Sequence, residues 1–311
     1  MTDVLVLRAL GLGDLLTSVA ALRGLRRAWP DDRLVLAAPA GVGEWLVSLG
    51  VVDDAVAVRD LPDAGGLGSR VPPPGVAVNL HGRGPESHDV LSLLHPGRVV
   101  AYACPEAGHP DGPAWRENEH EVDRWIRLSQ WAGGPAGVED LRLPPPSERS
   151  DHVVVHPGAA APSRRWPAPL WAAVAAALTA RGRRVVVTGS LAEAGPCATV
   201  AAGAPGVEDL CGRLDLGGLG RLVGTAALVL SGDTGIAHVA TAFGTPSVTL
   251  FGPVSPALWG PRVDHHLHRV IWTGDAADPR PGDPHGAAVD PRLASIAAGE
   301  VLEAASAVLA R

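Results

Sequence analysis

Short apolar runs alternate with longer amphipathic segments along the whole chain. Buried strands are predicted where the runs are rich in Val, Leu and Ala, at residues 4–7, 34–38, 55–58, 76–80, 98–102, 153–155, 184–188, 207–210, 227–230 and 247–251. Helices are predicted where apolar positions recur at helical spacing, at residues 15–25, 42–49, 87–94, 121–131, 168–180, 192–202, 216–223, 236–243 and 291–311. Strands that alternate with helices in this way predict parallel, doubly wound sheets.

The alternation is interrupted once, by the proline-rich segment at residues 143–151, which has no periodic apolar positions and is typical of a linker. We therefore predict two Rossmann-like domains facing a cleft, at residues 1–146 and 151–290. A C-terminal helix at residues 291–311 would follow and can pack back on the N-terminal domain. At 311 residues the chain is long enough for two such cores.

Charge and composition argue against several classes of protein. A formal net charge of −7 argues against a nucleic-acid partner. The chain begins directly with a strand, and no apolar run approaches the length of a membrane span, so we expect a cytoplasmic protein. Three cysteines without close spacing give no metal or redox motif, and the histidines of Asp264-His-His-Leu-His268 are interpreted as a loop. We expect no metal site.

One polar turn has the features of a phosphate site. Gly232-Asp-Thr-Gly235 follows the strand at 227–230 and precedes a helix, so backbone N–H groups would point from the helix N-terminus toward a ligand. Asp233, Thr234, Gly235 and His238 are the candidates here. The alternative is an ordinary helix cap beside a core histidine.

Two turns in the N-terminal half are candidate acceptor contacts. The first is Gly11-Leu-Gly-Asp14, which lacks the third glycine of a dinucleotide fingerprint, so the NAD reading is weak. Asp14 is either a general base or a first-turn acid that serves the helix dipole, and Arg8 either holds an anion or pairs with Asp14. The further candidates in this turn are Arg8 and Gly13. The Gly-rich turn at 79–88 provides His81, Arg83, Ser87 and His88, although it could equally be a plain capped loop.

Two turns in the C-terminal half could serve a nucleotide. Arg164 and Arg165 follow the strand at 153–155 and would suit a pyrophosphate, although a surface basic pair has the same appearance. Glu193 lies one turn beyond Gly189, where a carboxylate could accept ribose hydroxyls or could simply start a helix.

Together these motifs resemble glycosyltransferase family nine, the ADP-heptose:lipopolysaccharide heptosyltransferases and their relatives, which have the two-domain GT-B fold. The resemblance is carried over nearly the whole chain by Gly11-x-Gly-Asp14-x-x-Thr17, Arg164-Arg-Trp-Pro167, Asp233-Thr-Gly-x-x-His238, Gly244-Thr-Pro246, Leu250-Phe-Gly-Pro253 and Trp259-Gly-Pro261. The last blocks are long and specific, whereas the first block alone is weak.

The resemblance implies an inverting, metal-independent transfer of a sugar from a nucleotide-sugar co-substrate, with no cofactor. Asp14 matches the general base, Arg164 stands in place of a phosphate-binding Lys, and Glu193 matches the ribose contact. Asp233 matches a residue near the donor sugar, and Thr234, Gly235 and His238 match diphosphate contacts. The N-terminal domain would bind the acceptor and the C-terminal domain the donor. Ala159 and Ala160 replace hydroxyl residues that are often present.

Several alternatives stay open. A nucleotide-sugar 2-epimerase shares the architecture, a degenerate member would bind a nucleotide sugar without turnover, and a nicotinamide oxidoreductase is the weakest candidate. ADP-heptose is the first candidate donor, but neither the donor base and sugar nor the acceptor glycan follows from the sequence, and the oligomeric state is unknown. Membrane contact would be at most peripheral, through Arg23, Arg26 and Arg27, where a solvated helix face is the simpler interpretation.

Overall fold

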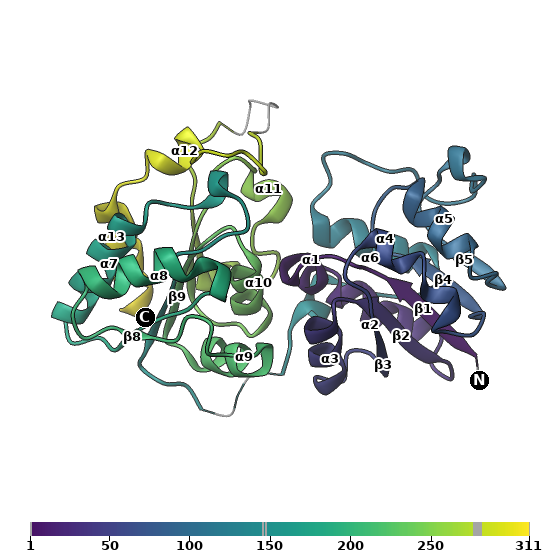
Figure 1. Ribbon diagram of the computed structural model, residues 1–311, viewed down its shortest axis with the longest axis horizontal. Helices are drawn as coiled ribbons and strands as arrows, with labels where there is room; N and C mark the ends of the chain where they lie inside the picture. The colour runs from purple at the N-terminus through teal and green to yellow at the C-terminus, as the bar shows by residue number, and fades with distance from the viewer. Residues whose placement is uncertain (1, 145, 147, 276–281, 311) are drawn as a thin grey trace. The chain divides into compact units, whose positions relative to one another are not determined.

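The computed structural model describes residues 2–144, 146, 148–275 and 282–310, and the chain divides into two compact units, Met1–Leu141 and Arg142–Arg311 (Figure 1). Each unit is built from one parallel β-sheet and its crossover helices.

The N-terminal unit contains a five-stranded sheet in the order β3-β2-β1-β4-β5, and every pair in it is parallel. Its main elements in chain order are β1 (Asp3–Leu7), α1 (Leu12–Thr17), α2 (Val19–Ala28), β2 (Arg33–Ala38), α3 (Ala40–Ser48), β3 (Asp54–Ala57), α4 (Leu61–Ala64), β4 (Val76–Asn79), α5 (Glu86–Ser92), β5 (Arg98–Val100) and α6 (Glu121–Trp131).

The C-terminal unit contains a six-stranded sheet in the order β11-β10-β9-β6-β7-β8, again with all pairs parallel. Its main elements are β6 (Val153–His156), α7 (Ala168–Ala180), β7 (Val185–Val187), α8 (Ala194–Gly203), β8 (Glu208–Asp209), α9 (Leu216–Thr225), β9 (Leu228–Gly232), α10 (Gly235–Ala242), β10 (Ser247–Leu250), α11 (Pro256–Trp259), β11 (His268–Ile271), α12 (Pro291–Ala294) and α13 (Ala298–Leu309).

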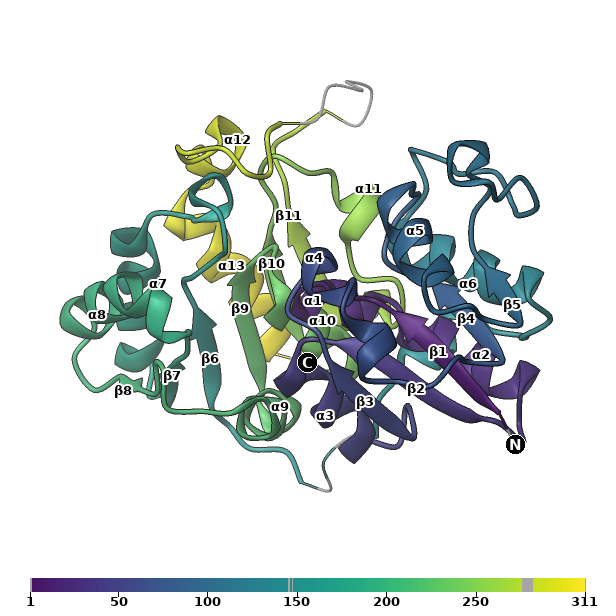
Figure 2. The ribbon, with the colours of Figure 1, turned by 45° about the vertical axis from the view of Figure 1, so that its right-hand side comes forward.

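Helices cover both faces of each sheet, which explains why the strands are apolar on both sides (Figure 2). In the N-terminal unit α2 packs on α6, while residues of α4 and α5 join β1, β2 and β4 in a separate apolar cluster. In the C-terminal unit α7, α8 and α13 pack together over the cluster around Trp166 and Trp171, and α9 packs with α10. The two indole rings meet edge to face at 4.7 Å.

The predicted fold of two α/β domains with parallel sheets is confirmed, and the structure differs from the sequence-based assignments at three places. His268 begins the edge strand β11 instead of closing a loop, because its ring is buried and Ser247 on β10 contacts its Nδ1 at 2.9 Å. The predicted helix at residues 291–311 is divided into α12 and α13, and α13 packs on α7, β9 and β10 of the C-terminal unit because Val301, Ala305 and Val308 enter the C-terminal core.

The third difference concerns the start of the predicted linker. Leu143 is buried, and its N–H donates to the Ala242 carbonyl at 2.7 Å, so the C-terminal unit begins at Arg142. Among the described residues, no helix is long and apolar enough to cross a membrane.

Candidate active site

The strand order gives each sheet one position where consecutive connections leave in opposite directions. In the N-terminal unit this switch point lies between β1 and β4, and in the C-terminal unit it lies between β6 and β9. Ligands of open α/β sheets bind outside the carboxyl ends of the strands at such a point. The sequence candidates concentrate there, because Asp14 and His81 follow β1 and β4, while Arg164 and Thr234 follow β6 and β9.

Asp14 lies in the short helix α1, with its side chain one-third exposed. The helix starts at Gly11 without a side-chain cap, and Asp14 is the only acidic residue of its first turn. Its Oδ1 lies 4.0 Å from Nη2 of Arg8. The carboxylate therefore stays accessible to solvent while a buried cation lies behind it.

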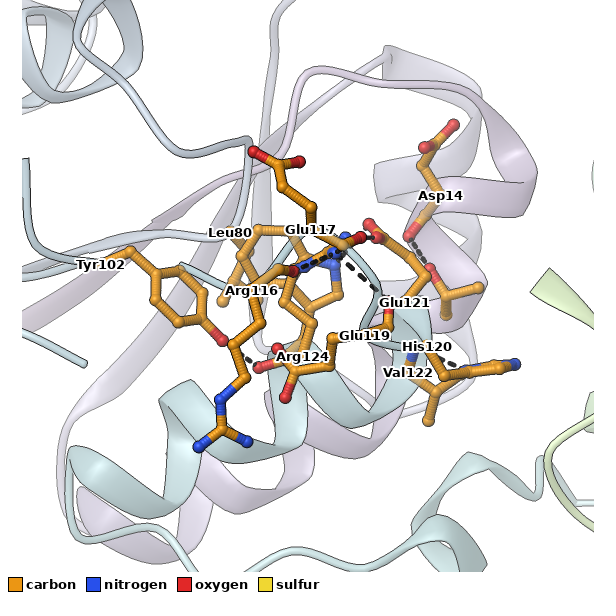
Figure 3. A network of polar contacts seen from close by, with 12 residues as sticks. Asp14, Leu80, Tyr102, Arg116, Glu117, Glu119, His120, Glu121, Val122 and Arg124 are labelled. Atoms are coloured by element: carbon orange, nitrogen blue, oxygen red, sulfur yellow. Dashed lines mark hydrogen bonds and ion pairs between the residues drawn. The ribbon is translucent and has the colours of Figure 1, made fainter. Parts of the chain in front are cut away.

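Arg8, in contrast, is completely buried. It contacts Asp14, Leu80 and Glu121, which are labelled in the polar network of Figure 3. Its Nε donates to the Asp14 carbonyl at 2.6 Å, its Nη1 donates to the Leu80 carbonyl, and its Nη2 lies 3.0 Å from Glu121 Oε1. This geometry supports the pairing alternative for Arg8 and leaves its guanidinium no exposed surface for an acceptor anion.

The turn after β4 separates the four remaining candidates into two groups. Ser87 and His88 are buried, because the Asn79 amide donates to Ser87 Oγ at 2.9 Å and lies 3.1 Å from His88 Nδ1. His88 Nε2 lies 2.9 Å from the Tyr102 carbonyl, so both ring nitrogens have internal partners. These two residues hold the turn together through internal contacts, and their role as acceptor contacts stays a prediction.

His81 and Arg83 remain accessible from solvent. Arg83 is exposed and pairs with Glu117 at 2.8 Å. The His81 Nδ1 atom is buried without a hydrogen-bond partner among the described residues. Burial and the positive charge of Arg8 lower the pKa of His81 to about 4, so this ring is neutral at neutral pH. Gly13, in α1, contributes no side chain to the site.

The turn after β9 has the geometry expected of an anion site. Thr234 is the N-cap of α10 and adopts extended backbone angles, and Gly235 is the first residue of the helix. The helix N-terminus thus presents backbone donors and the positive end of its dipole at the switch point. Asp233 is buried, and its N–H donates to the Leu250 carbonyl at 2.9 Å.

Several unpartnered polar atoms lie around this turn, as others do elsewhere in the chain. Four buried side-chain atoms without a hydrogen-bond partner among the described residues lie on the end of β9 and on the turns after β6 and β9: Ser163 Oγ, Arg164 Nε, Ser231 Oγ and Thr234 Oγ1. Burying such groups without a partner is costly. Their gathering at one edge therefore points to a polar ligand that completes their hydrogen bonds.

The two adjacent arginines have different roles in the structure. Arg165 donates through Nε to the Ala159 carbonyl at 2.8 Å and through Nη2 to the Ala160 carbonyl at 3.3 Å, so it closes its own loop. Arg164 reaches across to β9, where its Nη1 donates to the Asp233 carbonyl at 3.5 Å. Of the pair, Arg164 is thus the one whose guanidinium lies beside the Thr234 turn.

Glu193 is held in a defined position after β7. Its Oε2 accepts from Ser190 N–H at 2.7 Å and from Ser190 Oγ at 2.8 Å, while its Oε1 lies 3.8 Å from His156 Nε2. His156 ends β6 and its Nδ1 lies 3.1 Å from Thr188 Oγ1. Burial lowers the pKa of His156, and Glu193 opposes this shift. The carboxylate therefore faces a neutral imidazole.

Two features of the site were not apparent from the sequence. Gly158 makes room for Glu193, since a Cβ at this glycine would lie 2.2 Å from Glu193 Oε1. Glu121 anchors Arg8 although the two residues are 113 positions apart in the chain.

His238, the remaining candidate, lies with its ring 6.1 Å from that of Trp259. No group of three potential metal ligands occurs among the residues that the structure describes.

Comparison with known proteins identifies the family of the C-terminal half. The model of glycosyltransferase family 9 (heptosyltransferase) matches residues 137–276. Lipopolysaccharide heptosyltransferase 3 of Escherichia coli is 30% identical over 165 residues, which are 50% of this chain and 46% of that relative. The chain thus matches less than half the length of this curated relative, and the family model leaves the Asp14 block outside its matched residues.

Likeness of fold covers both units. The structure of E. coli ADP-heptose lps heptosyltransferase II matches with a TM-score of 0.79 at 22% identity, over 100% of this chain and 99% of that one. E. coli heptosyltransferase WaaC with ADP matches with a TM-score of 0.74 at 18% identity, over 98% and 99%. The GT-B fold is therefore confirmed, and the resemblance to glycosyltransferase family nine is confirmed over residues 137–276.

Proposed function

We propose that this chain, whose residues 137–276 belong to glycosyltransferase family 9, is an inverting, metal-independent glycosyltransferase. It would move a heptose-like sugar from a nucleoside diphosphate donor, with ADP-heptose as the first candidate, to a hydroxyl group of a glycan or similar acceptor. The observation that carries this proposal is the group of unpartnered polar atoms around Arg164 and Thr234 at the switch point of the C-terminal sheet.

This group of atoms suits a diphosphate. A guanidinium supplies fixed positive charge and planar donors, a threonine hydroxyl supplies one more donor, and the N-terminus of α10 adds backbone N–H groups. When the glycosidic bond breaks, the diphosphate gains negative charge, and donors already aimed at it stabilise the transition state. Arg164, Thr234 and Gly235 would perform this work, with Glu193 as the acceptor of ribose hydroxyl protons.

Asp14 would act on the other substrate. As the acceptor oxygen bonds to the anomeric carbon and the bond from that carbon to the phosphate oxygen breaks, the hydroxyl proton passes to the Asp14 carboxylate. Attack from the face opposite the leaving group inverts the anomeric centre. Two observations support this role: one-third of the side chain is exposed, and Asp14 lies just beyond the carboxyl end of β1. The cytoplasmic location remains a prediction.

The alanines that replace the usual hydroxyl residues differ in exposure. Ala159 is buried and Ala160 is exposed, and both carbonyls accept from Arg165. The loop that would surround the phosphates is thus stabilised by a second arginine. A binding module without turnover would share all of these contacts, so donor binding and sugar transfer have to be measured separately.

The test is calorimetry with ADP-, GDP-, UDP- and dTDP-sugars, each with and without EDTA, followed by transfer assays with the donor that binds. We expect one base to bind in the micromolar range, to keep its affinity in EDTA and to lose it in Arg164→Ala. Arg269→Ala is the matched control, because Arg269 is exposed on the edge strand β11. Loss of binding in EDTA would refute metal independence, and binding without transfer to any acceptor would favour the binding module.

A further inference from the structure

Two side chains, those of Arg8 and Thr17, hold the main chain of α1 at Asp14. Arg8 donates to the main-chain carbonyl of Asp14 at 2.6 Å, and its Nη2 lies 3.3 Å from Thr17 Oγ1. Thr17 Oγ1 in turn donates to the same Asp14 carbonyl at 2.7 Å. Figure 3 shows the Asp14 carboxylate pointing away from this network. Arg8 therefore holds the backbone of Asp14 and leaves its carboxylate to the solvent side.

A cation this close has an electrostatic effect on the carboxylate. The Arg8 guanidinium lies 4.0 Å from Asp14 Oδ1 and is fully buried, where screening by water is weak. Alone, it would stabilise the charged form of Asp14 and make it a poorer proton acceptor. A general base works best when its pKa is not far below the working pH.

Glu121 counteracts this effect. It lies at the start of α6, and its Oε1 accepts from Arg8 Nη2 at 3.0 Å and from Trp125 Nε1 at 2.7 Å. Its Oε2 accepts from Arg124, whose Nη2 also donates to the carbonyls of Arg116, Glu117 and Glu119. The Glu121 carboxylate is 3.0 Å from the Arg8 guanidinium and that of Asp14 is 4.0 Å away, so Glu121 neutralises more of the Arg8 charge.

The other charged groups around α1 do not replace this pair. The His81 ring, beyond the end of β4, is neutral at neutral pH. In α2, Arg23 donates to the Asp140 carbonyl, Arg26 pairs with Asp53, and Arg27 pairs with Asp140. On α6, Arg124 pairs with Glu121, and Arg127 pairs with Glu119 at 2.6 Å. Of these groups in the N-terminal unit, Arg8 lies 4.0 Å from the Asp14 carboxylate, and Glu121 is the ion-pair partner of Arg8.

We propose that Arg8 and Glu121 are positioning residues for Asp14: Arg8 fixes the turn that carries the carboxylate, and Glu121 draws the Arg8 charge away from it. This inference rests on the proposed role of Asp14 as general base. It predicts opposite electrostatic effects for the two members of one ion pair. A purely structural pair would instead lower stability in both variants and leave the titration of Asp14 unchanged.

The experiment is a carbon-detected NMR titration of protein labelled at the aspartate carboxyl carbon, with the Asp14 signal assigned by Asp14→Asn. We expect the pKa of Asp14 to fall by about 0.5–1 unit in Glu121→Gln and to rise by about 1 unit in Arg8→Gln. Arg8→Lys keeps the charge, so the pKa of Asp14 should stay near that of the wild type. The acid limb of the pH–rate profile for sugar transfer should move in the same directions.

Glu119→Gln is the matched control, because it removes the partly buried pair between Glu119, which precedes α6, and Arg127 of α6, whereas the partner of Arg8 is Glu121. We expect this variant to leave the Asp14 titration unchanged. If Arg8→Gln does not fold, Glu121→Gln and Arg8→Lys still decide. The inference would be overturned if the pKa of Asp14 were the same in the wild type and in folded Glu121→Gln. It would also be overturned if this pKa shifted in the same direction in Glu121→Gln and Arg8→Gln. Because the titration needs no acceptor, its outcome is separate from failure of the proposed function, which unchanged transfer by Asp14→Asn would reveal.

Discussion

Replacing Gly158 with alanine should displace Glu193 without changing its charge. The added Cβ would lie 2.2 Å from Oε1 and 2.3 Å from Cδ of Glu193, which is far inside contact distance. The backbone at Gly158 does not have a positive φ, so alanine introduces no strain of its own. The obstacle is the end of a flexible side chain, so we expect the Glu193 carboxylate to move and the loop to stay.

The magnitude follows from the contacts that the carboxylate loses. Its two bonds to Ser190, at 2.7 and 2.8 Å, form a helix-capping arrangement, and such caps contribute about 0.5–2 kcal/mol to stability. A hydrogen bond from a ribose hydroxyl to a charged acceptor contributes about 1.5–3 kcal/mol. We therefore expect the Kd for ADP to rise about 10- to 150-fold in Gly158→Ala.

The assay is calorimetry with two ligands, ADP and inorganic pyrophosphate. Gly158→Ala should weaken ADP and leave pyrophosphate unchanged, because pyrophosphate has no ribose. Combining it with Glu193→Ala should cost nothing beyond the single variants, since both remove the same contact. Gly195→Ala is the control, because a Cβ there would meet nothing within 4 Å. Wild-type affinity of Gly158→Ala for ADP would refute the ribose assignment, and an equal loss for pyrophosphate would show that the loop itself has moved.

Three further outcomes are expected. Asp14→Asn should keep ADP affinity and lose about 10²- to 10⁴-fold in transfer rate, and equal losses in both would contradict a role as base. Gly24→Ala should unfold more easily by about 1–3 kcal/mol in a denaturant titration, because its Cβ would meet Ser129 Oγ at 2.2 Å where α2 crosses α6; an unchanged midpoint would mean that the helices can separate at no cost. Burial lowers the pKa of His268 to about 4 from 6.5, so its contribution to stability is present above pH 6.5 and is lost as the pH falls toward 4. The thermal midpoint of His268→Gln should therefore depend less on pH between 6.5 and 5 than that of the wild type.

The strands and helices follow from the sequence because their apolar periodicity is long and regular. The parallel-sheet prediction needed only the alternation of buried runs and amphipathic segments, and all ten predicted strands occur in the structure. The eleventh, β11, was missed because His268-Arg-Val-Ile271 has no buried run and gains its burial from Ser247 and the neighbouring strand. Edge strands are half exposed, so their apolar pattern is weak.

The site was only partly predictable, because a polar residue after a parallel strand has two possible roles. Thr234 and Arg164 have polar atoms without a hydrogen-bond partner. Ser87 and His88, in contrast, contact Asn79, and His88 also contacts the Tyr102 carbonyl. Both pairs look alike in the sequence, since each follows a strand and a glycine. Only the hydrogen bonds in the folded chain separate residues with unpartnered polar atoms, which we propose bind the donor, from residues whose polar atoms stabilise the turn.

The contacts of Glu121 could not be predicted from the sequence either. In the sequence it is an acid in the first turn of a helix, a position that the helix dipole alone explains. In the structure it is almost fully buried, and burial raises its pKa, but the attraction of Arg8 and Arg124 outweighs burial and the net shift is downward. An acid that only served the dipole would remain exposed. Its burial between two arginines costs solvation free energy that a surface position avoids, and the attraction of the two guanidinium groups offsets that cost. Under the role proposed for Asp14, Arg8 is buried because it holds the Asp14 turn, and Glu121 neutralises the Arg8 charge so that Asp14 can accept a proton.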